Sequence, residues 1–187
     1  MKRLAPVLIM CALSGSLFAA NYDLAQAERA CSLKSDEGCF QAAMYYYEGV
    51  DTKRDARKAV QYFERGCDFG SVASCLAAAD EYKRGDAIRP DIRRALKLYS
   101  QACSYKSGEG CTSAGLAYGA HDNPVADSKK ALEFLQRGCD LGDGSGCFLA
   151  GGAVEAGVGT SADPAKAKEL FGRSCKLGNK NGCQKAK

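Results

Sequence analysis

Apolar residues recur along the chain at helical spacing, and the same arrangement returns every 36 residues. One set starts with the motif Asp-x-x-Lys/Arg-Ala and then places apolar residues on one face of a helix. Its copies, DARKA, DIRRA, DSKKA and DPAKA, begin at Asp55, Asp91, Asp127 and Asp163. An aspartate at a helix start accepts hydrogen bonds from free backbone N–H groups and suits the positive end of the helix dipole. The pattern therefore predicts a helix after each of these aspartates.

A second apolar pattern fills the other half of each period. Its copies are FQAAMYYYEG (40–49), LAAADEYKRG (76–85), TSAGLAYGAH (112–121) and FLAGGAVEAG (148–157). Alanine recurs in one column, and four residues later, on the same helix face, stand Tyr46, Tyr82, Tyr118 and Val154. These segments predict a second helix that ends at a glycine, a place that His121 takes in the third copy. Helix pairs repeated at a fixed period predict an all-α fold, an α/α solenoid.

Ten of the eleven cysteines follow the same period, with separations that alternate between 8 and 28 residues. Pairing across 28 residues would leave Cys31 and Cys183 without partners, whereas pairing across 8 residues uses every cysteine. We therefore expect the disulfides Cys31–Cys39, Cys67–Cys75, Cys103–Cys111, Cys139–Cys147 and Cys175–Cys183. Loop-closure entropy assigns each such ring about 2.5 kcal/mol of stabilisation.

The turns between paired cysteines also admit other interpretations. The turn CDLGDGSGC (139–147) has the glycines of a phosphate-binding loop, but Lys34 and Lys106 take the place of Gly142 in two other copies. Structural zinc sites favour cysteines two to four residues apart, often with histidine, and this chain has seven intervening residues and a single histidine. No Cys-x-x-Cys motif supports redox chemistry. We expect no metal and no cofactor.

The first twenty residues have the composition of a secretory signal peptide. Met1-Lys2-Arg3 is basic, residues 4–18 are mostly apolar, and Ala19-Ala20 precede polar Asn21. Lipid attachment at Cys11 is disfavoured, because the preceding Met10 is not small. We assign residues 1–20 to the signal peptide and 21–187 to the solenoid. No later apolar run reaches membrane length, so we expect a secreted or periplasmic protein without a membrane span.

Charge argues against two classes of partner. Removing Lys2 and Arg3 leaves 24 basic against 22 acidic residues, a net charge of +2. This balance does not indicate nucleic acid or an anionic membrane as the partner. The basic runs Arg93-Arg94 and Lys129-Lys130 are interpreted as solvated helix faces.

The 36-residue period, the Asp-x-x-Lys-Ala start and the Ala…Tyr…Gly helix resemble Sel1-like repeats, which are relatives of the tetratricopeptide repeat. With a Cys-x7-Cys turn in every repeat, residues 22 to 187 are similar to the Helicobacter cysteine-rich protein family. The resemblance implies an exported α/α solenoid with one disulfide per repeat. Members of that family are described as penicillin-binding proteins with slow β-lactamase activity and as secreted proteins that engage host or envelope partners. The resemblance implies these functions for this chain.

No residues in the sequence match the catalytic motifs usual for the implied β-lactamase activity. The usual serine and zinc hydrolase motifs give no usable catalytic set, His121 is the only histidine, and Ser145 has no histidine near it in sequence. We therefore name no catalytic residue. Slow β-lactam hydrolysis by a penicillin-binding protein is the alternative function, and only the resemblance supports it.

Binding is the function that the sequence favours, because stacked helix pairs build curved surfaces that hold partners. In the repeats that the chain resembles, the Ala…Tyr…Gly helix lines the concave side. We predict a binding face there, made of Gln41, Tyr45, Glu48, Asp80, Glu81 and Arg84. Tyr46 is predicted to lie in the core, while Gly115, Gly119, Gly151 and Gly152 leave room either for a ligand or for close packing. The expected partner is a protein or peptide segment, with a peptidoglycan-related or β-lactam ligand as the alternative.

Overall fold

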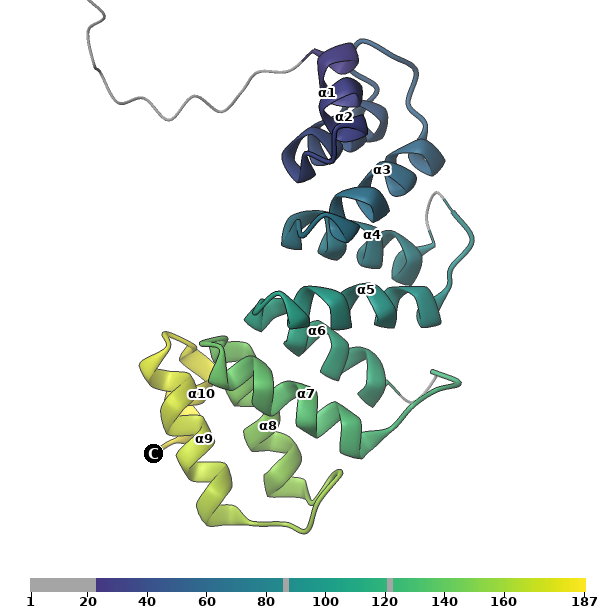
Figure 1. Cartoon of the computed structure of the whole chain (residues 1–187). Helices are drawn as coiled ribbons and strands as arrows, with labels where there is room; N and C mark the ends of the chain where they lie inside the picture. The colour runs from purple at the N-terminus through teal and green to yellow at the C-terminus, as the bar shows by residue number, and fades with distance from the viewer. Residues whose placement is uncertain (1–22, 86–87, 121–122) are drawn as a thin grey trace, which may run out of the picture.

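Ten α-helices follow one another in a single stack in the residues that the structure, a computed structural model, describes: 23–85, 88–120 and 123–187 (Figure 1). They are α1 (Leu24–Ser32), α2 (Asp36–Glu48), α3 (Ala56–Asp68), α4 (Val72–Arg84), α5 (Ile92–Ser104), α6 (Gly108–Gly119), α7 (Ser128–Asp140), α8 (Gly144–Ala156), α9 (Pro164–Lys176) and α10 (Lys180–Lys185). Consecutive helices pack against each other, and these residues contain no strand. The predicted α/α solenoid is confirmed. The predicted signal peptide (1–20) and His121 lie outside the described residues.

Two kinds of helix alternate along the stack. We call α2, α4, α6, α8 and α10 the A helices, and α1, α3, α5, α7 and α9 the B helices. The predicted aspartates cap four B helices, and each carboxylate accepts a 3.0 Å hydrogen bond from the backbone N–H three residues later. At Asp127 this bond from Lys130 lowers the pKa of the carboxyl group. The A helices are capped by Ser35, Ser71, Ser107, Asp143 and Asn179.

Each B helix ends in a tight turn with a left-handed residue. Gly70, Gly142 and Gly178 adopt φ of 104°, 88° and 85°, the conformation with which glycine commonly ends a helix. In the other two copies Lys34 and Lys106 adopt φ of 67° and 63°, a conformation that costs a non-glycine residue about 1–2 kcal/mol. The turn geometry is therefore kept in all five copies, even where the local residue opposes it.

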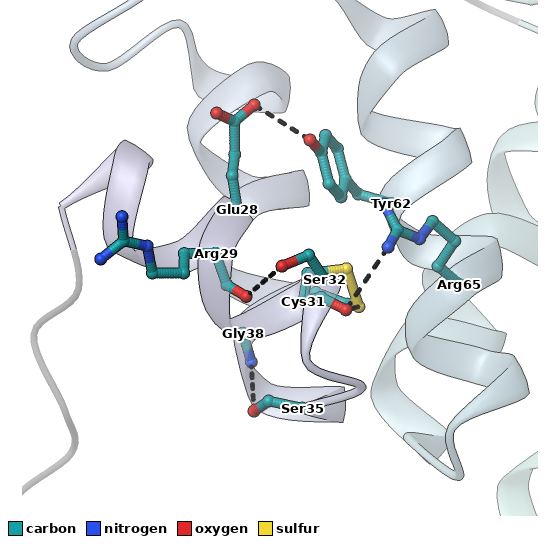
Figure 2. The surroundings of a disulfide bond; sticks show 9 residues. Glu28, Arg29, Cys31, Ser32, Ser35, Gly38, Tyr62 and Arg65 are labelled. Atoms are coloured by element: carbon teal, nitrogen blue, oxygen red, sulfur yellow. Dashed lines mark hydrogen bonds between the residues drawn. A yellow bond between two sulfur atoms is a disulfide. The ribbon is translucent and has the colours of Figure 1, made fainter.

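Five disulfides join the end of each B helix to the start of the next A helix. The pairing is the local one expected from the spacing, with Cα–Cα distances of 4.3–4.5 Å. A side chain from the following B helix also reaches back to each of the first four turns. Figure 2 shows the first case, in which the Arg65 guanidinium donates to the Cys31 carbonyl at 3.4 Å. The equivalent donors are Gln101 to Cys67, Arg137 to Cys103 and Arg173 to Cys139.

The residues just before the two cysteines of a turn face each other, and at least one of them is always glycine. A Cβ atom on Gly66 would lie 2.4 Å from Ser74 Oγ, and one on Gly182 would lie 2.6 Å from Ser174 Cβ. The five pairs are Ala30–Gly38, Gly66–Ser74, Ala102–Gly110, Gly138–Gly146 and Ser174–Gly182. The helices cross here with too little space for two full side chains, because protein interiors are close-packed.

The core forms two clusters along the stack. One extends from Ala43 to Ala117 and contains the large side chains of Phe63 and Tyr99. The other extends from Leu132 to Phe171. The predicted core column is buried at Tyr46, Tyr82 and Val154, whereas Tyr118 is only partly buried. Tyr118 instead lines a groove at the surface.

Candidate binding surface

The six residues predicted as a binding face lie on two neighbouring A helices. Gln41, Tyr45 and Glu48 belong to α2, and Asp80, Glu81 and Arg84 belong to α4. The two helices contact each other. We call the side of the stack that these residues occupy the A face. Tyr45 and Glu81 hold equivalent positions one repeat apart, as do Glu48 and Arg84, so the structure brings the six residues into adjacent rows.

The two acids of α4 among the six, Asp80 and Glu81, are engaged within the fold. Glu81 is only 3% exposed, and its carboxylate binds the Arg84 guanidinium. The Glu81 hydrogen bond raises the pKa of Arg84, which keeps a fixed positive charge on a half-exposed side chain. Glu81 can therefore contribute to a surface only through Arg84. Asp80 accepts a hydrogen bond from the Tyr99 hydroxyl.

Tyr99, on the B helix α5, is buried beneath this surface and contacts one of its residues. Its ring is in the core, and its hydroxyl reaches Asp80 on α4. Burial first, and then the hydrogen bond to Asp80, raise the pKa of Tyr99 above its ordinary value. In the sequence, Tyr99 holds the same position of the 36-residue period as the apolar residues Phe63 and Leu135. The signal that was missed is the single hydroxyl in that column.

The side chains of α2 differ in how far they are exposed. Tyr46 is buried, as predicted. Tyr47 packs partly against the core and lies under the Arg54 guanidinium, 5.5 Å from the ring centroid. Tyr45 is half-buried, Gln41 donates to Glu37 at 2.8 Å, and Glu48 is exposed. The exposed part of the A face on α2 is thus polar and carries one aromatic ring.

Further along the stack the A face becomes small and apolar. Leu116 is 47% exposed and stands one repeat after Asp80. The glycines of this region divide into two groups. A Cβ on Gly115 would lie 2.7 Å from Leu135 Cγ, and one on Gly151 would lie 2.8 Å from Phe171 Cε1, so these two glycines serve close helix packing. Gly152 has no atom near its Cβ position and is open.

A second kind of surface follows the B helices, where tyrosines of the A helices lie beneath basic side chains. Lys58 Nζ is 4.8 Å from the Tyr46 ring centroid, Arg94 Cζ is 5.3 Å from that of Tyr82, and Lys130 Nζ is 5.6 Å from that of Tyr118. Such cation–π contacts are favourable. The basic runs interpreted as solvated faces are exposed, but Arg94 and Lys130 also cover aromatic rings.

Carboxylates complete the first two of these sites. Glu28 accepts hydrogen bonds from the hydroxyls of Tyr46 and Tyr62 at 2.8 and 2.9 Å; Figure 2 shows the bond from Tyr62. Burial, followed by the hydrogen bond to Glu28, raises the pKa of Tyr62 to about 12. One repeat later, Glu64 accepts from the Tyr82 hydroxyl at 3.0 Å, and Arg94 donates to the same hydroxyl at 2.7 Å. Sequence reasoning missed these networks.

The described residues contain neither a membrane-spanning helix nor a cluster of metal ligands. No helix combines the length and hydrophobicity that crossing a membrane requires. No group of three or more histidine, cysteine, aspartate or glutamate side chains gathers there as a metal site.

The similarity of the chain to known proteins lies in its repeats. A family model described as Sel1 repeat matches residues 36–70, 72–104, 110–143 and 145–179. Each match holds one A helix and the following B helix, so the disulfides lie at the junctions of the repeats. A search of curated protein sequences gives no match.

Solved structures of Sel1 repeat proteins are similar to the stack. A Sel1 repeat protein from Oxalobacter formigenes superposes with a TM-score of 0.75 at 18% identity, over 86% of this chain and 66% of that one. A protective antigen of uropathogenic Escherichia coli with an SLR fold gives 0.74 at 20% identity, over 87% of this chain and 35% of that one. The chain thus spans about a third of the antigen. Cysteine rich protein B of Helicobacter pylori gives 0.57 at 27% identity, over 73% and 98%.

Proposed function

The chain belongs to the Sel1 repeat family, and on that premise we propose that it is an exported scaffold that binds a protein or peptide segment along the A face of α2 and α4. Sel1 repeats generally mediate protein–protein interaction. The observation that carries the proposal is the set of polar and aromatic side chains on two adjacent A helices. Tyr45, Glu48 and Arg84 present a ring, a negative charge and a positive charge on helices whose starts are fixed by disulfides.

Rigidity supports this assignment. A partner that binds a preorganised surface loses less free energy to ordering of the protein than one that binds flexible loops. The internal Glu81–Arg84 and Asp80–Tyr99 contacts hold two of the polar groups in place before any partner arrives. The proposed partner therefore presents complementary charge and an apolar side chain to a fixed row of groups.

The compartment is part of the proposal. Five disulfides point to an oxidising, extracytoplasmic environment, because the cytosol keeps most thiols reduced. We assign the protein to the periplasm or to the outside of the cell, with residues 1–20 as the signal that directs it there. Mass spectrometry of the protein recovered from its native host tests this assignment, since a mature N-terminus near Asn21 is expected and an intact Met1 would contradict it.

A peptide-display selection tests the binding surface. The affinities of peptides selected on the oxidised protein are then measured for the variant Gln41→Ala/Tyr45→Ser/Glu48→Arg. Arg84 is left intact, because its loss would leave the buried Glu81 carboxylate without its charge partner. We expect affinity to fall about tenfold or more, the loss typical of central interface residues. The control Lys166→Ala/Lys168→Ala changes exposed residues of α9. Equal affinity for the A-face variant and the control would contradict the proposed surface.

Slow β-lactam hydrolysis and binding of a peptidoglycan-related ligand remain predictions from the resemblance. No arrangement of described side chains favours either over polypeptide binding. Turnover of a chromogenic β-lactam by the oxidised protein, compared with a reduced sample and a mock purification, tests the enzymatic alternative. Turnover that follows the folded protein would replace the binding proposal with an enzymatic one.

A further inference from the structure

The groove between α5 and α7 differs from its counterpart one repeat earlier in the charges of its lining residues. Both grooves have a tyrosine from an A helix and a basic residue over its ring, Tyr82 with Arg94 and Tyr118 with Lys130. In the earlier groove the Glu64 carboxylate binds the tyrosine hydroxyl and lies 4.0 Å from Arg94. The residue 36 positions after Glu64 is Ser100.

The loss of this carboxylate leaves the later groove strongly basic. The described residues that line this hollow of about 370 Å³ include Arg93, Lys97 and Lys130 and no carboxylate. Among the described residues, neither Arg93 nor Lys97 forms an ion pair. Asp127 lies 3.7 Å from Lys130 Nζ and already caps α7, and Lys97 also lines a separate hollow with Glu64 and Asp68. Lys97 replaces neutral Gln61 of the earlier groove, so the change from Glu64 to Ser100 is accompanied by an added positive charge.

We propose that this groove binds a carboxylate of an acidic polypeptide segment, which occupies the position that Glu64 occupies one repeat earlier. The incoming carboxylate accepts hydrogen bonds from the Tyr118 and Ser100 hydroxyls and pairs with Lys97 and Lys130. Charge-assisted hydrogen bonds of this kind are the strong ones in proteins. The site is separate from the A face and rests on the proposed function only in that the ligand is a polypeptide.

The neighbouring surface favours a polypeptide over a small anion. Arg93 also lines the adjoining groove between α3 and α5, a hollow of about 670 Å³ with apolar walls from Val60, Ile88 and Ile92. A segment that extends from one groove into the other places apolar side chains against these walls and a carboxylate beside Ser100. A phosphate ion would use the basic groove alone.

Fluorescence anisotropy with a labelled hexapeptide, Glu-Glu-Leu-Glu-Glu-Leu, tests the proposal on the oxidised protein. The neutral match replaces every glutamate of the peptide with glutamine. We expect the acidic peptide to bind, and Ser100→Glu to raise its Kd about tenfold to a hundredfold by restoring the internal acid. Ser100→Gln adds the same bulk without charge and should raise the Kd less than Ser100→Glu does, so the difference between the two variants measures the effect of the charge. Lys166→Ala, at the position equivalent to Lys130 where Val154 replaces the tyrosine, should change the Kd little.

A converse variant makes the test independent of loss of folding. Glu64→Ser removes the acid from the earlier groove. We expect this variant to bind a second acidic peptide in that groove. Equal binding to wild type and Ser100→Glu, failure of the acidic peptide to bind, or equal binding of the neutral peptide would overturn the proposal. The proposal would also be overturned if tripolyphosphate displaced the peptide, bound more tightly than the peptide does, and lost affinity in Ser100→Glu to the same extent. The A-face triple variant should bind the hexapeptide normally, which separates this test from that of the proposed function.

Discussion

The two halves of the solenoid hold the same fold together by different means. In the first half, from α1 to α5, tyrosine hydroxyls bind Glu28 and Glu64 between helices. In the second half, from α6 to α10, Gly115 and Gly151 replace the alanines at 43 and 79 and let helix pairs approach closely. Polar networks thus give way to direct helix contact along one chain.

The comparison shows how a repeat can change its surface without changing its frame. Caps, left-handed turns and disulfides recur in both halves, because they set the positions of the helices. Residues outside this frame vary. The acid at 28 and 64 becomes Ser100, and the polar A face of α4 becomes Leu116 and Gly152 further along. We infer that binding properties reside in the positions that break the repeat.

Removing one disulfide from each half tests whether the frame is equivalent in both. Cys67→Ala/Cys75→Ala and Cys139→Ala/Cys147→Ala each open a ring of the same size, so each should lower the free energy of unfolding by about 2.5 kcal/mol. Urea denaturation of both variants under identical conditions measures the two losses. A much larger loss for one variant would show that its half depends on the disulfide in a way that ring size does not explain.

Glycine substitutions test the close contact in the second half. Gly115→Ala places a Cβ 2.7 Å from Leu135 Cγ and 2.9 Å from the Ala131 carbonyl oxygen, which cannot move easily. Overpacking of this kind costs about 1–3 kcal/mol. Gly152→Ala meets no atom and should instead stabilise its helix by up to about 1 kcal/mol. Thermal unfolding followed by circular dichroism distinguishes them, and a similar effect of the two substitutions would contradict the account.

Alkaline pH tests the polar network of the first half. The pKa of Tyr62 is raised from 10.0 to about 12 in the folded protein, so the neutral phenol is favoured there. This contribution to stability is complete below pH 10 and is lost as pH rises toward 12. We expect Tyr62→Phe to make stability less dependent on pH in this window, measured by urea denaturation at several pH values. The control is Tyr105→Phe, at an exposed site; an identical pH dependence in wild type and Tyr62→Phe would contradict the network.

Much of the frame could be predicted from the sequence because its signals are local and repeated. The capping aspartates and the spacing of cysteines each determine geometry within a few residues, and five copies exclude accidental motifs. The left-handed Lys34 and Lys106 could be placed only because glycine holds their position in the other copies. Repetition therefore supplied information that no single copy contains.

The candidate surface was harder to predict because it depends on how each helix is rotated about its axis. Glu81 was expected on the binding face, but its side chain is buried and binds Arg84. Tyr99 reaches the A face from a B helix, a contact between segments 19 residues apart. The pairing of Arg94 with Tyr82 likewise joins two helices, and neither residue alone indicates it. Such contacts follow from packing between elements, which hydrophobic periodicity does not specify.

The most direct test of the central claim is to map the contact surface of a selected peptide by NMR chemical shifts of the oxidised, isotope-labelled protein. The account predicts that the shifted amides cluster on α2 and α4, around Tyr45 and Arg84, and that the rest of the stack is little affected. Shifts centred instead on the exposed apolar residues of the disulfide turns, such as Leu33 and Leu141, would contradict the assignment of the A face as the binding surface.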